Sequence, residues 1–232
     1  MTAHDSSSPR SPATSRPSRP SGKGYAVKEA FLTLQGEGVQ AGSRAVFVRF
    51  AGCNLWSGRE QDRADAQCSF CDTDFVGTDG PGGGRFSTAD ALADHVAALW
   101  GEGADRRLTV VTGGEPMLQL DDALIDALHR RGFRVAAESN GTLPAVAGLD
   151  WICVSPKAGT DVVQRSGDEL KLVWPQPGID PTELESWGFD HFLVQPMDCA
   201  EREAAIEAAI RLAMERPKWR LTLQAHKVVG LA

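Results

Sequence analysis

The chain has 232 residues, of which 42% are hydrophobic and 24% charged, so we expect one globular domain, or at most two small ones. No apolar run approaches the ~18–20 residues needed to cross a membrane, which excludes a membrane-spanning protein. The net charge of −7 divides into +3 over residues 1–23 and −10 over the remainder. An acidic body argues against broad nucleic-acid binding, which relies on clustered lysine and arginine.

Residues 1–23 are rich in serine, proline and arginine and contain no large aliphatic side chain after Met1. Such a segment cannot bury enough apolar surface to offset its ordering entropy. We therefore expect a disordered tail, followed by a single domain over residues 24–232. The tail also lacks the apolar region of a secretory signal, and the five cysteines are an odd number. These features favour a metal or redox role in the reducing cytoplasm over a disulfide framework.

The globular part shows two hydrophobic patterns in turn. Short apolar runs predict strands at residues 44–51, 108–112, 133–138, 150–155, 169–174, 191–195 and 219–224. Helical spacing predicts three main helices at residues 87–100, 120–131 and 200–216. The first opens with a capping box at Ser87 and Asp90, the second ends before Gly132, and the third stops at Pro217. The hydrophobic residues expected to lie on one face are Leu92, Val96 and Leu99 in the first helix, Leu124, Ile125 and Leu128 in the second, and Ile206, Ile210, Ala213 and Met214 in the third.

Strands that alternate with helices predict right-handed βα units and a mainly parallel sheet. The connections at residues 155–169 and 174–191 are too short or too broken for full helices. The expected fold is therefore an α/β protein: an incomplete, helix-poor (β/α) barrel of about six mainly parallel strands and three main helices. Functional residues in such sheets gather at the carboxyl ends of the strands.

Three of the cysteines lie just after the first predicted strand. Cys53, Cys68 and Cys71 have the spacing Cys-x14-Cys-x2-Cys, and Cys53 can reach the other two only if residues 54–67 loop out. Three unrelated thiols would not be expected to cluster in this way. A structural zinc site requires four ligands, and no fourth cysteine or histidine lies nearby in the sequence. Three thiolates on a [4Fe–4S] cluster would leave one iron open for a further ligand.

A second motif, Gly113-Gly114-Glu115-Pro116, follows the predicted strand at residues 108–112. Its glycines allow the backbone to approach a ligand closely, and its proline can begin a helix without losing a hydrogen bond. A Gly-Gly turn after one strand and three cysteines after another resemble the radical S-adenosylmethionine superfamily, in which the cysteine spacing is usually x3 and then x2.

Further short motifs narrow this resemblance to the 7-carboxy-7-deazaguanine synthase family, a subset of which has a long insert between the first two cysteines. The resemblance runs from about Tyr25 to the C-terminus. It rests on Thr33-Leu-Gln-Gly-Glu-Gly38, Arg49-Phe-Ala-Gly-Cys53-Asn-Leu, Cys71-Asp-Thr-Asp74, Glu138-Ser-Asn140, Ser155-Pro-Lys157 and Gln195-Pro-Met197.

The resemblance implies the ring contraction of 6-carboxy-5,6,7,8-tetrahydropterin to 7-carboxy-7-deazaguanine with loss of ammonia, on the route to queuosine and other deazapurines. The implied cofactors are a [4Fe–4S] cluster, S-adenosyl-L-methionine and Mg²⁺. A 5′-deoxyadenosyl radical would take a hydrogen atom from the pterin and later recover it, so that the cofactor is reused. The implied partners are the pterin, an electron donor such as flavodoxin or ferredoxin, and a second copy in a homodimer, with no role for nucleic acid or membrane.

The same resemblance assigns roles to individual residues. The cluster would be bound by Cys53, Cys68 and Cys71, and Mg²⁺ by Thr73. S-adenosylmethionine would contact Phe70, Cys71, Asp72, Gly114, Ser155, Pro156, Lys157, Gln195, Pro196, Met197 and Asp198. The substrate would contact Leu34, Gln35, Gly36, Arg49, Thr112 and Ala232. Within this last set, Arg49 would pair with the substrate carboxylate, and the terminal carboxylate of Ala232 would accept hydrogen bonds from the amino-pyrimidine edge.

Structural alternatives remain for several of these residues. Leu34 could be part of the core, Arg49 a charge on the strand surface, and Ser155 a turn residue. Glu37, Glu138 and His226 could move protons or could be hydrogen-bonded structural groups. For Cys153 and Cys199 the expectation is a small buried apolar residue.

Two other functions also fit parts of the pattern. An activase that installs a glycyl radical on a partner protein would use the same cofactor, but it would leave the segment Thr33–Gly38 without a purpose. A non-catalytic zinc module would be colourless, whereas an iron–sulfur enzyme is brown.

Overall fold

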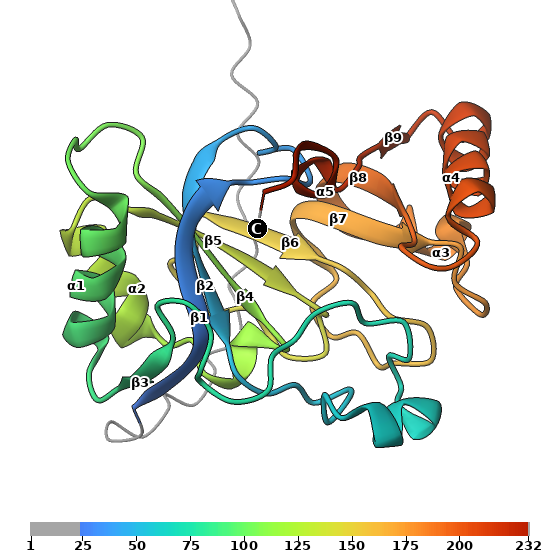
Figure 1. The fold of residues 1–232 in the computed structure, drawn as a ribbon. Coiled ribbons are helices and arrows are strands. Elements are labelled where there is room, and N and C mark those ends of the chain that lie inside the picture. The colour runs from blue at the N-terminus through green and yellow to red at the C-terminus, as the bar shows by residue number, and fades with distance from the viewer. Residues whose placement is uncertain (1–23, 232) are drawn as a thin grey trace, which may run out of the picture.

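Nine strands form one sheet in the computed structural model, which describes residues 24–231 (Figure 1). The order across the sheet is β3-β1-β2-β4-β5-β6-β7-β8-β9. The strands are β1 (Tyr25–Leu34), β2 (Arg44–Phe50), β3 (Gly84–Phe86), β4 (Leu108–Gly113), β5 (Arg134–Ser139), β6 (Trp151–Val154), β7 (Ser166–Trp174), β8 (Gly188–Pro196) and β9 (Trp219–Leu221). The predictions for the tail at residues 1–23 and for Ala232 lie outside the described residues.

From β2 through β9 every neighbouring pair of strands is parallel, whereas β1 pairs antiparallel with both β2 and β3. The sheet ends at β3 on one side and β9 on the other, and these edges do not pair with each other. This arrangement confirms the expected α/β fold with a mainly parallel, incomplete barrel. All seven predicted strands exist, although β9 ends at Leu221 and not at residue 224.

Two strands, β1 and β3, were not anticipated. In β1 the register shifts between Val27 and Glu29, so that Val27 and Ala30 are both buried and the alternation of a half-exposed strand is interrupted. β3 has only three residues, which is too short for a pattern to be recognised. Both strands lie at the antiparallel edge of the sheet.

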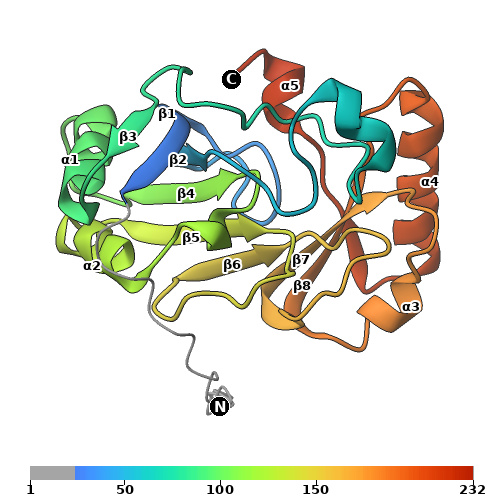
Figure 2. The same ribbon diagram turned by 90° about the horizontal axis from the view of Figure 1, so that it is seen from below.

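Three main helices cover the sheet at its two ends: α1 (Ala89–Trp100) and α2 (Asp122–Arg130) at the β1–β5 end, and α4 (Arg202–Glu215) at the β7–β9 end (Figures 1 and 2). The N-cap of α1 is Thr88, whose hydroxyl accepts a hydrogen bond from Ala91 N, and not the predicted Ser87. Two short helices, α3 (Pro181–Leu184) and α5 (Ala225–Val229), complete the set together with two 3₁₀ helices, Glu60–Asp65 and Pro116–Leu118.

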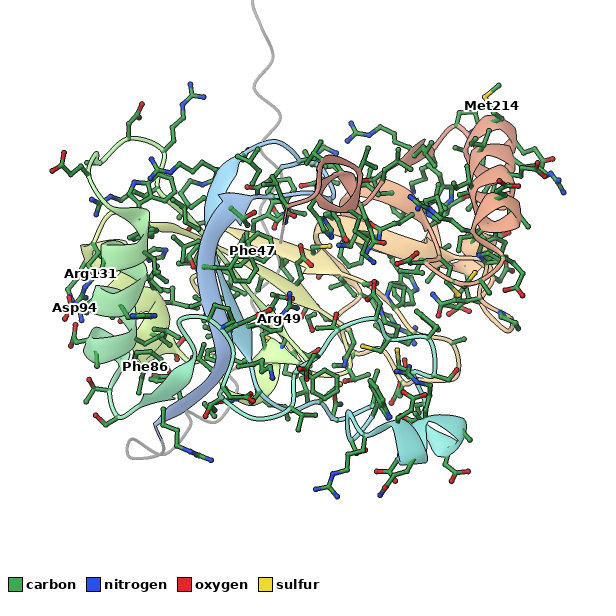
Figure 3. The ribbon with its side chains drawn as sticks, in the orientation of Figure 1. Phe47, Arg49, Phe86, Asp94, Arg131 and Met214 are labelled. Atoms are coloured by element: carbon green, nitrogen blue, oxygen red, sulfur yellow. The ribbon has the colours of Figure 1, made fainter. Side chains whose placement is uncertain are left out.

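The predicted faces of α1 and α2 are confirmed in large part. Leu124, Ile125 and Leu128 are buried in α2, as are Leu92 and Val96 in α1, although Leu99 is only partly buried. The two helices are also joined at their surface, where Arg131 lies 2.7 Å from Asp94 and 3.0 Å from Asp90 (Figure 3 labels Arg131 and Asp94).

The predicted face of α4 is wrong for Ile210 and Met214, whereas Ile206 and Ala213 are partly buried. Its buried residues are Ala205, Ala209 and Leu212, whereas Ile210 is 44% exposed and Met214 is 79% exposed. Figure 3 shows Met214 pointing outward from α4. Alanine side chains let the helix backbone lie close to the sheet, and this packing outweighs the larger hydrophobic residues one position away.

The connections that were predicted to lack full helices do lack them. Residues 155–165 contain no helix, and the connection from β7 to β8 contains only the four-residue α3. The carboxyl ends of the parallel strands are therefore left to loops. No helix within residues 24–231 is long and apolar enough to cross a membrane.

Candidate active site

A cavity of about 450 Å³ lies at the carboxyl ends of the parallel strands. Its lining comes from β1, β2, β4, β5, β7 and β8, from loops that follow these strands and β6, and from the C-terminal segment after β9. The sequence-predicted residues that line it are Leu34, Gln35, Gly36, Arg49, Cys68, Phe70, Cys71, Asp72, Thr73, Thr112, Gly114, Ser155, Lys157, Gln195, Pro196, Met197 and Asp198. The expectation that candidate residues gather at this edge of the sheet is confirmed.

Three residues of the predicted site are not in this lining. Cys53 follows β2 beside the cavity, Pro156 lies between two lining residues, and Ala232 is outside the described part of the chain. Leu34 is 42% exposed and lines the cavity, so it is not a core residue.

The loop after β2 brings two of its thiols together. The Cys68 thiol donates a hydrogen bond to Cys71, which lowers the pKa of Cys71 to about 6 and raises the pKa of Cys68. Burial raises the pKa of Cys53, and the charge of Cys71 adds to this rise. Cys68 and Cys71 therefore form a pair, and Cys53 lies close enough to be influenced by the charge of Cys71.

The Gly-Gly turn after β4 is shaped by its contact with the strand that precedes Cys53. A Cβ atom on Gly114 would lie 2.2 Å from Gly52 O and 2.7 Å from the Cβ of Cys53. Gly113 has a φ of +148°, and a Cβ there would lie 2.4 Å from Phe50 O. Only glycine allows this close approach between the ends of β2 and β4.

Glu115, the residue after the two glycines, stabilises this turn through hydrogen bonds. It is fully buried and accepts hydrogen bonds from Met117 N at 2.9 Å, Ser139 Oγ at 2.9 Å and Asn140 N at 2.8 Å. It does not line the cavity, and its bonds fix the Gly-Gly turn to the end of β5.

Lys157 supplies a positive charge near the thiols. Its Nζ donates to Ser155 O at 2.9 Å and to Ser155 Oγ at 2.7 Å, and it lies 5.9 Å from the centre of the Phe70 ring. Its charge contributes to the lowered pKa of Cys71 and partly offsets the raised pKa of Cys68. A cation beside these thiols suits an anionic thiolate-bound group.

The donor set suits an iron–sulfur cluster. Cys68 and Cys71 line the cavity and Cys53 lies beside it, and cysteine thiolates are the ligands that hold such clusters. Among residues 24–231, no group of three His, Cys, Asp or Glu side chains is arranged to hold a single metal ion.

Arg49 also lines the cavity, and it is paired with Thr112 across β2 and β4. The Arg49 side chain is 19% exposed, and its Nε donates to Glu29 Oε1 at 2.7 Å. Figure 3 shows Arg49 and Phe47 on β2. Arg49 is therefore not a charge on the outer strand surface. Glu29, which lies on the unanticipated strand β1, was missed by the sequence analysis.

A charge network centred on a buried lysine also lines the cavity. Lys171, on β7, is ion-paired with Glu37 and lies 3.4 Å from Glu138. Gln35 Nε2 donates to Glu138 Oε1 at 2.9 Å, and Gln224 Nε2 donates to Glu37 Oε1 at 3.0 Å. Sequence reasoning missed Lys171, and the available signal was a lysine within the apolar run of a buried strand.

The C-terminal segment closes one side of the cavity. Ala225 N donates to Gly36 O at 2.9 Å, and a Cβ on Gly36 would lie 2.1 Å from His226 Nδ1. Lys227, another residue that the sequence analysis missed, lies 2.6 Å from both Asp72 and Asp198. The segment thus connects the cysteine loop with the end of β8.

Thr73 lines the cavity, and its hydroxyl donates to Asp72 Oδ1 at 3.5 Å. Of the two remaining cysteines, Cys153 is buried as expected, and its thiol donates to Glu169 at 3.4 Å. Cys199 is only partly buried, so the expectation of a buried residue is wrong there. Neither lines the main cavity.

Comparisons with known proteins agree with this geometry. A model of the radical SAM superfamily matches residues 62–169. A 7-carboxy-7-deazaguanine synthase of Caulobacter vibrioides is 61% identical over 207 residues, which are 89% of this chain and 99% of the relative. One from Bordetella pertussis is 58% identical over the same shares of the two chains.

The fold also matches a solved structure. The crystal structure of QueE from Escherichia coli superposes with a TM-score of 0.62 at 24% identity, covering 88% of this chain and 95% of that one. The structural likeness supports the fold, and the high identity to the bacterial relatives decides the family. The chain belongs to the 7-carboxy-7-deazaguanine synthase family of the radical SAM superfamily.

Proposed function

We propose that this chain catalyses the ring contraction of 6-carboxy-5,6,7,8-tetrahydropterin to 7-carboxy-7-deazaguanine with loss of ammonia, in the cytoplasm, as a step in queuosine and deazapurine synthesis. The observation that carries the proposal is one cavity whose lining combines two kinds of chemical group. Cys68, Cys71 and the Gly-Gly turn suit a thiolate-bound cluster with its cofactor, and Arg49 and the amide of Gln35 suit a planar substrate that has a carboxylate.

The cysteines and the Gly-Gly turn belong to the proposed cofactor site. Cys53, Cys68 and Cys71 would hold a [4Fe–4S] cluster, which with S-adenosylmethionine supplies radical hydrogen abstraction when bound. The chain would bind and orient the S-adenosylmethionine through residues from three loops and from the end of β8 with the two residues after it: Phe70, Cys71, Asp72, Gly114, Ser155, Pro156, Lys157, Gln195, Pro196, Met197 and Asp198.

Arg49 and Gln35 belong to the proposed substrate site. Arg49 would pair with the pterin carboxylate through its planar guanidinium, and Thr112 lies beside it on β4. Leu34, Gln35 and Gly36 would bind the ring edge, together with the carboxylate of Ala232. Glu37, Glu138 and His226 all line the cavity and are the candidates for moving protons.

We further propose that Mg²⁺ binds near Thr73, where the substrate would supply further oxygen ligands. Magnesium commonly keeps several waters and takes few protein ligands, so a single hydroxyl suffices. Removal of Mg²⁺ should slow product formation far more than it weakens S-adenosylmethionine binding. A rate that is indifferent to chelation and readdition of Mg²⁺ would contradict this assignment.

The deciding experiment incubates the anaerobically purified, reduced protein with the carboxytetrahydropterin and S-adenosylmethionine. Mass spectrometry should then detect 7-carboxy-7-deazaguanine. Flavodoxin or ferredoxin is the proposed electron donor and a homodimer the proposed assembly, which size-exclusion chromatography would test.

Two cysteine variants provide matched controls. Cys68→Ala should lose the brown colour, the iron and the activity, because two thiolates do not hold the cluster firmly. Cys153→Ala should keep the visible absorption, since its thiol lies away from the cavity. A colourless parent protein that contains zinc would contradict the proposed function.

A further inference from the structure

The long insert between the first two cysteines, residues 54–67, folds back onto the loop that it interrupts. Trp56 is buried, donates its indole N–H to Arg59 O at 3.2 Å and packs edge-on against Phe75 with ring centres 5.6 Å apart. Gln67 N donates to Leu55 O at 3.2 Å, which closes the base of the insert. The insert is therefore a packed unit.

Arg63 connects this unit to the turn that carries the other two cysteines. Its Nη1 donates to Ser69 O at 2.8 Å and to Cys71 O at 3.1 Å. The guanidinium lies 4.1 Å from the centre of the Trp56 ring. Its Nε donates to both carboxylate oxygens of Glu60, at 2.9 and 2.8 Å. One side chain thus joins the 3₁₀ helix of the insert, its buried tryptophan and two carbonyls of the Cys68–Cys71 turn.

We infer that Arg63 is a positioning residue for the iron–sulfur site, which it serves by fixing the turn that carries Cys68 and Cys71. The inference rests on the proposed function, since it needs those thiols to bind a cluster. A lysine could not reproduce these contacts, because it has a single ammonium nitrogen. The guanidinium uses two nitrogens, Nε for Glu60 and Nη1 for the two carbonyls.

The position of Arg63 has two consequences for a bound cluster. The carbonyls of Ser69 and Cys71 point toward the guanidinium of Arg63. Because these peptide groups are trans, the N–H groups of the same peptides point in the opposite direction. Hydrogen bonds and charges around the thiolates set the potential of an iron–sulfur cluster. Removing the cation should therefore loosen the turn and make the cluster harder to reduce.

The test compares the cluster-loaded parent with Arg63→Ala, Arg63→Lys and Glu60→Gln. Arg59→Ala is the matched control, because Arg59 is an exposed arginine of the same insert. Release of iron to an added chelator, measured anaerobically, should be roughly tenfold faster from Arg63→Ala, since two hydrogen bonds from a charged donor are lost. Glu60→Gln, which keeps Arg63 but weakens its orientation, should show a smaller increase.

The midpoint potential of the cluster provides a second readout. Arg63→Ala should shift it to a more negative value, whereas Arg63→Lys keeps the charge and should restore most of the potential but not the slow release. Parent-like release and potential in Arg63→Ala would overturn the inference. If that variant cannot be obtained folded, Arg63→Lys and Glu60→Gln carry the test, and parent-like release from both overturns it. A parent chain that binds no cluster would instead contradict the proposed function itself.

Discussion

The orientation of Arg49 is set by a single neighbouring side chain. Glu29 accepts a hydrogen bond from Arg49 Nε, so the edge formed by the two terminal nitrogens is left to face another carboxylate. Two opposite charges are thereby fixed within the cavity wall. The geometry suits bidentate recognition of a carboxylate, which an ammonium group cannot provide.

Substitution Arg49→Lys should therefore weaken substrate binding by about 1–3 kcal/mol, the scale of a charged hydrogen bond. The measurement is the KM for the pterin, alongside cleavage of S-adenosylmethionine in the absence of substrate, which should change little. Arg85→Lys, at an exposed arginine on β3, is the control. Equal loss of both activities would place Arg49 in folding or cofactor binding.

Lys171 holds two carboxylates in a buried position. Its side chain is 5% exposed, and it pairs with Glu37 and Glu138. Burial alone would raise the pKa of Glu37, but the charge of Lys171 brings it below the usual 4.5. The stabilisation that Glu37 contributes is therefore complete above that pH and is lost as the pH falls through its folded pKa.

Substitution Lys171→Met should lower the free energy of unfolding by about 3–5 kcal/mol, because it leaves buried carboxylates without their cation. Urea unfolding at neutral pH should show this loss, and Lys171→Arg should retain most of the stability. As the pH falls below 4.5, the gap between the parent and Lys171→Met should narrow, because the parent then loses its own ion pair. A gap that does not depend on pH would contradict the ion-pair explanation.

At the scale of the element, α4 shows why a hydrophobic pattern can point to the wrong face. Ala205 and Ala209 face the sheet, and their small size sets the distance between helix and strand. Ile210 and Met214 have more apolar surface but lie toward solvent. Periodicity alone cannot distinguish the two faces, because both repeat at helical spacing.

The two faces of α4 should respond differently to substitution. Ala209→Leu adds volume at a fully buried position and should lower the free energy of unfolding by about 1–3 kcal/mol. Met214→Gln should change it by no more than about 0.5 kcal/mol, since the site is exposed and glutamine is a good helix former. Urea midpoints of the two variants provide the comparison, and the reverse order would show that the predicted face was correct.

Elements with a strong local signal were predictable from the sequence, whereas residues brought together by the fold were not. The parallel strands, the short connections and the cysteine loop each have their pattern within a few neighbouring residues. Glu29, Lys171 and Lys227 matter through partners distant in sequence, so no spacing rule identifies them. Arg63 lies only eight residues before Cys71, but its contact with Cys71 O depends on how the insert folds.

At the scale of the whole molecule, the cavity is assembled from both ends of the described chain. The loop after β1 supplies Gly36, and the C-terminal segment supplies His226, which packs against it. Lys227 then joins that segment to Asp72 and Asp198, from the cysteine loop and the end of β8. Changes at the C-terminal end should therefore affect the loop after β1, the cysteine loop and the end of β8.

The last prediction compares the two chain ends. A tag fused after Ala232 would convert the terminal carboxylate to an amide. The preceding residue, Leu231, already lies beside the cavity, because its N–H donates to the carbonyl of the cavity-lining His226 at 2.9 Å. If that carboxylate accepts hydrogen bonds from the amino-pyrimidine edge, two charge-assisted bonds of ~1.5–3 kcal/mol each would be weakened or lost. Deleting residues 1–22 should have no comparable effect, because that segment has no large aliphatic side chain after Met1 with which to pack. Substrate titrations of the intact, tagged and truncated proteins make the comparison, and unchanged affinity in the tagged protein would remove Ala232 from the site.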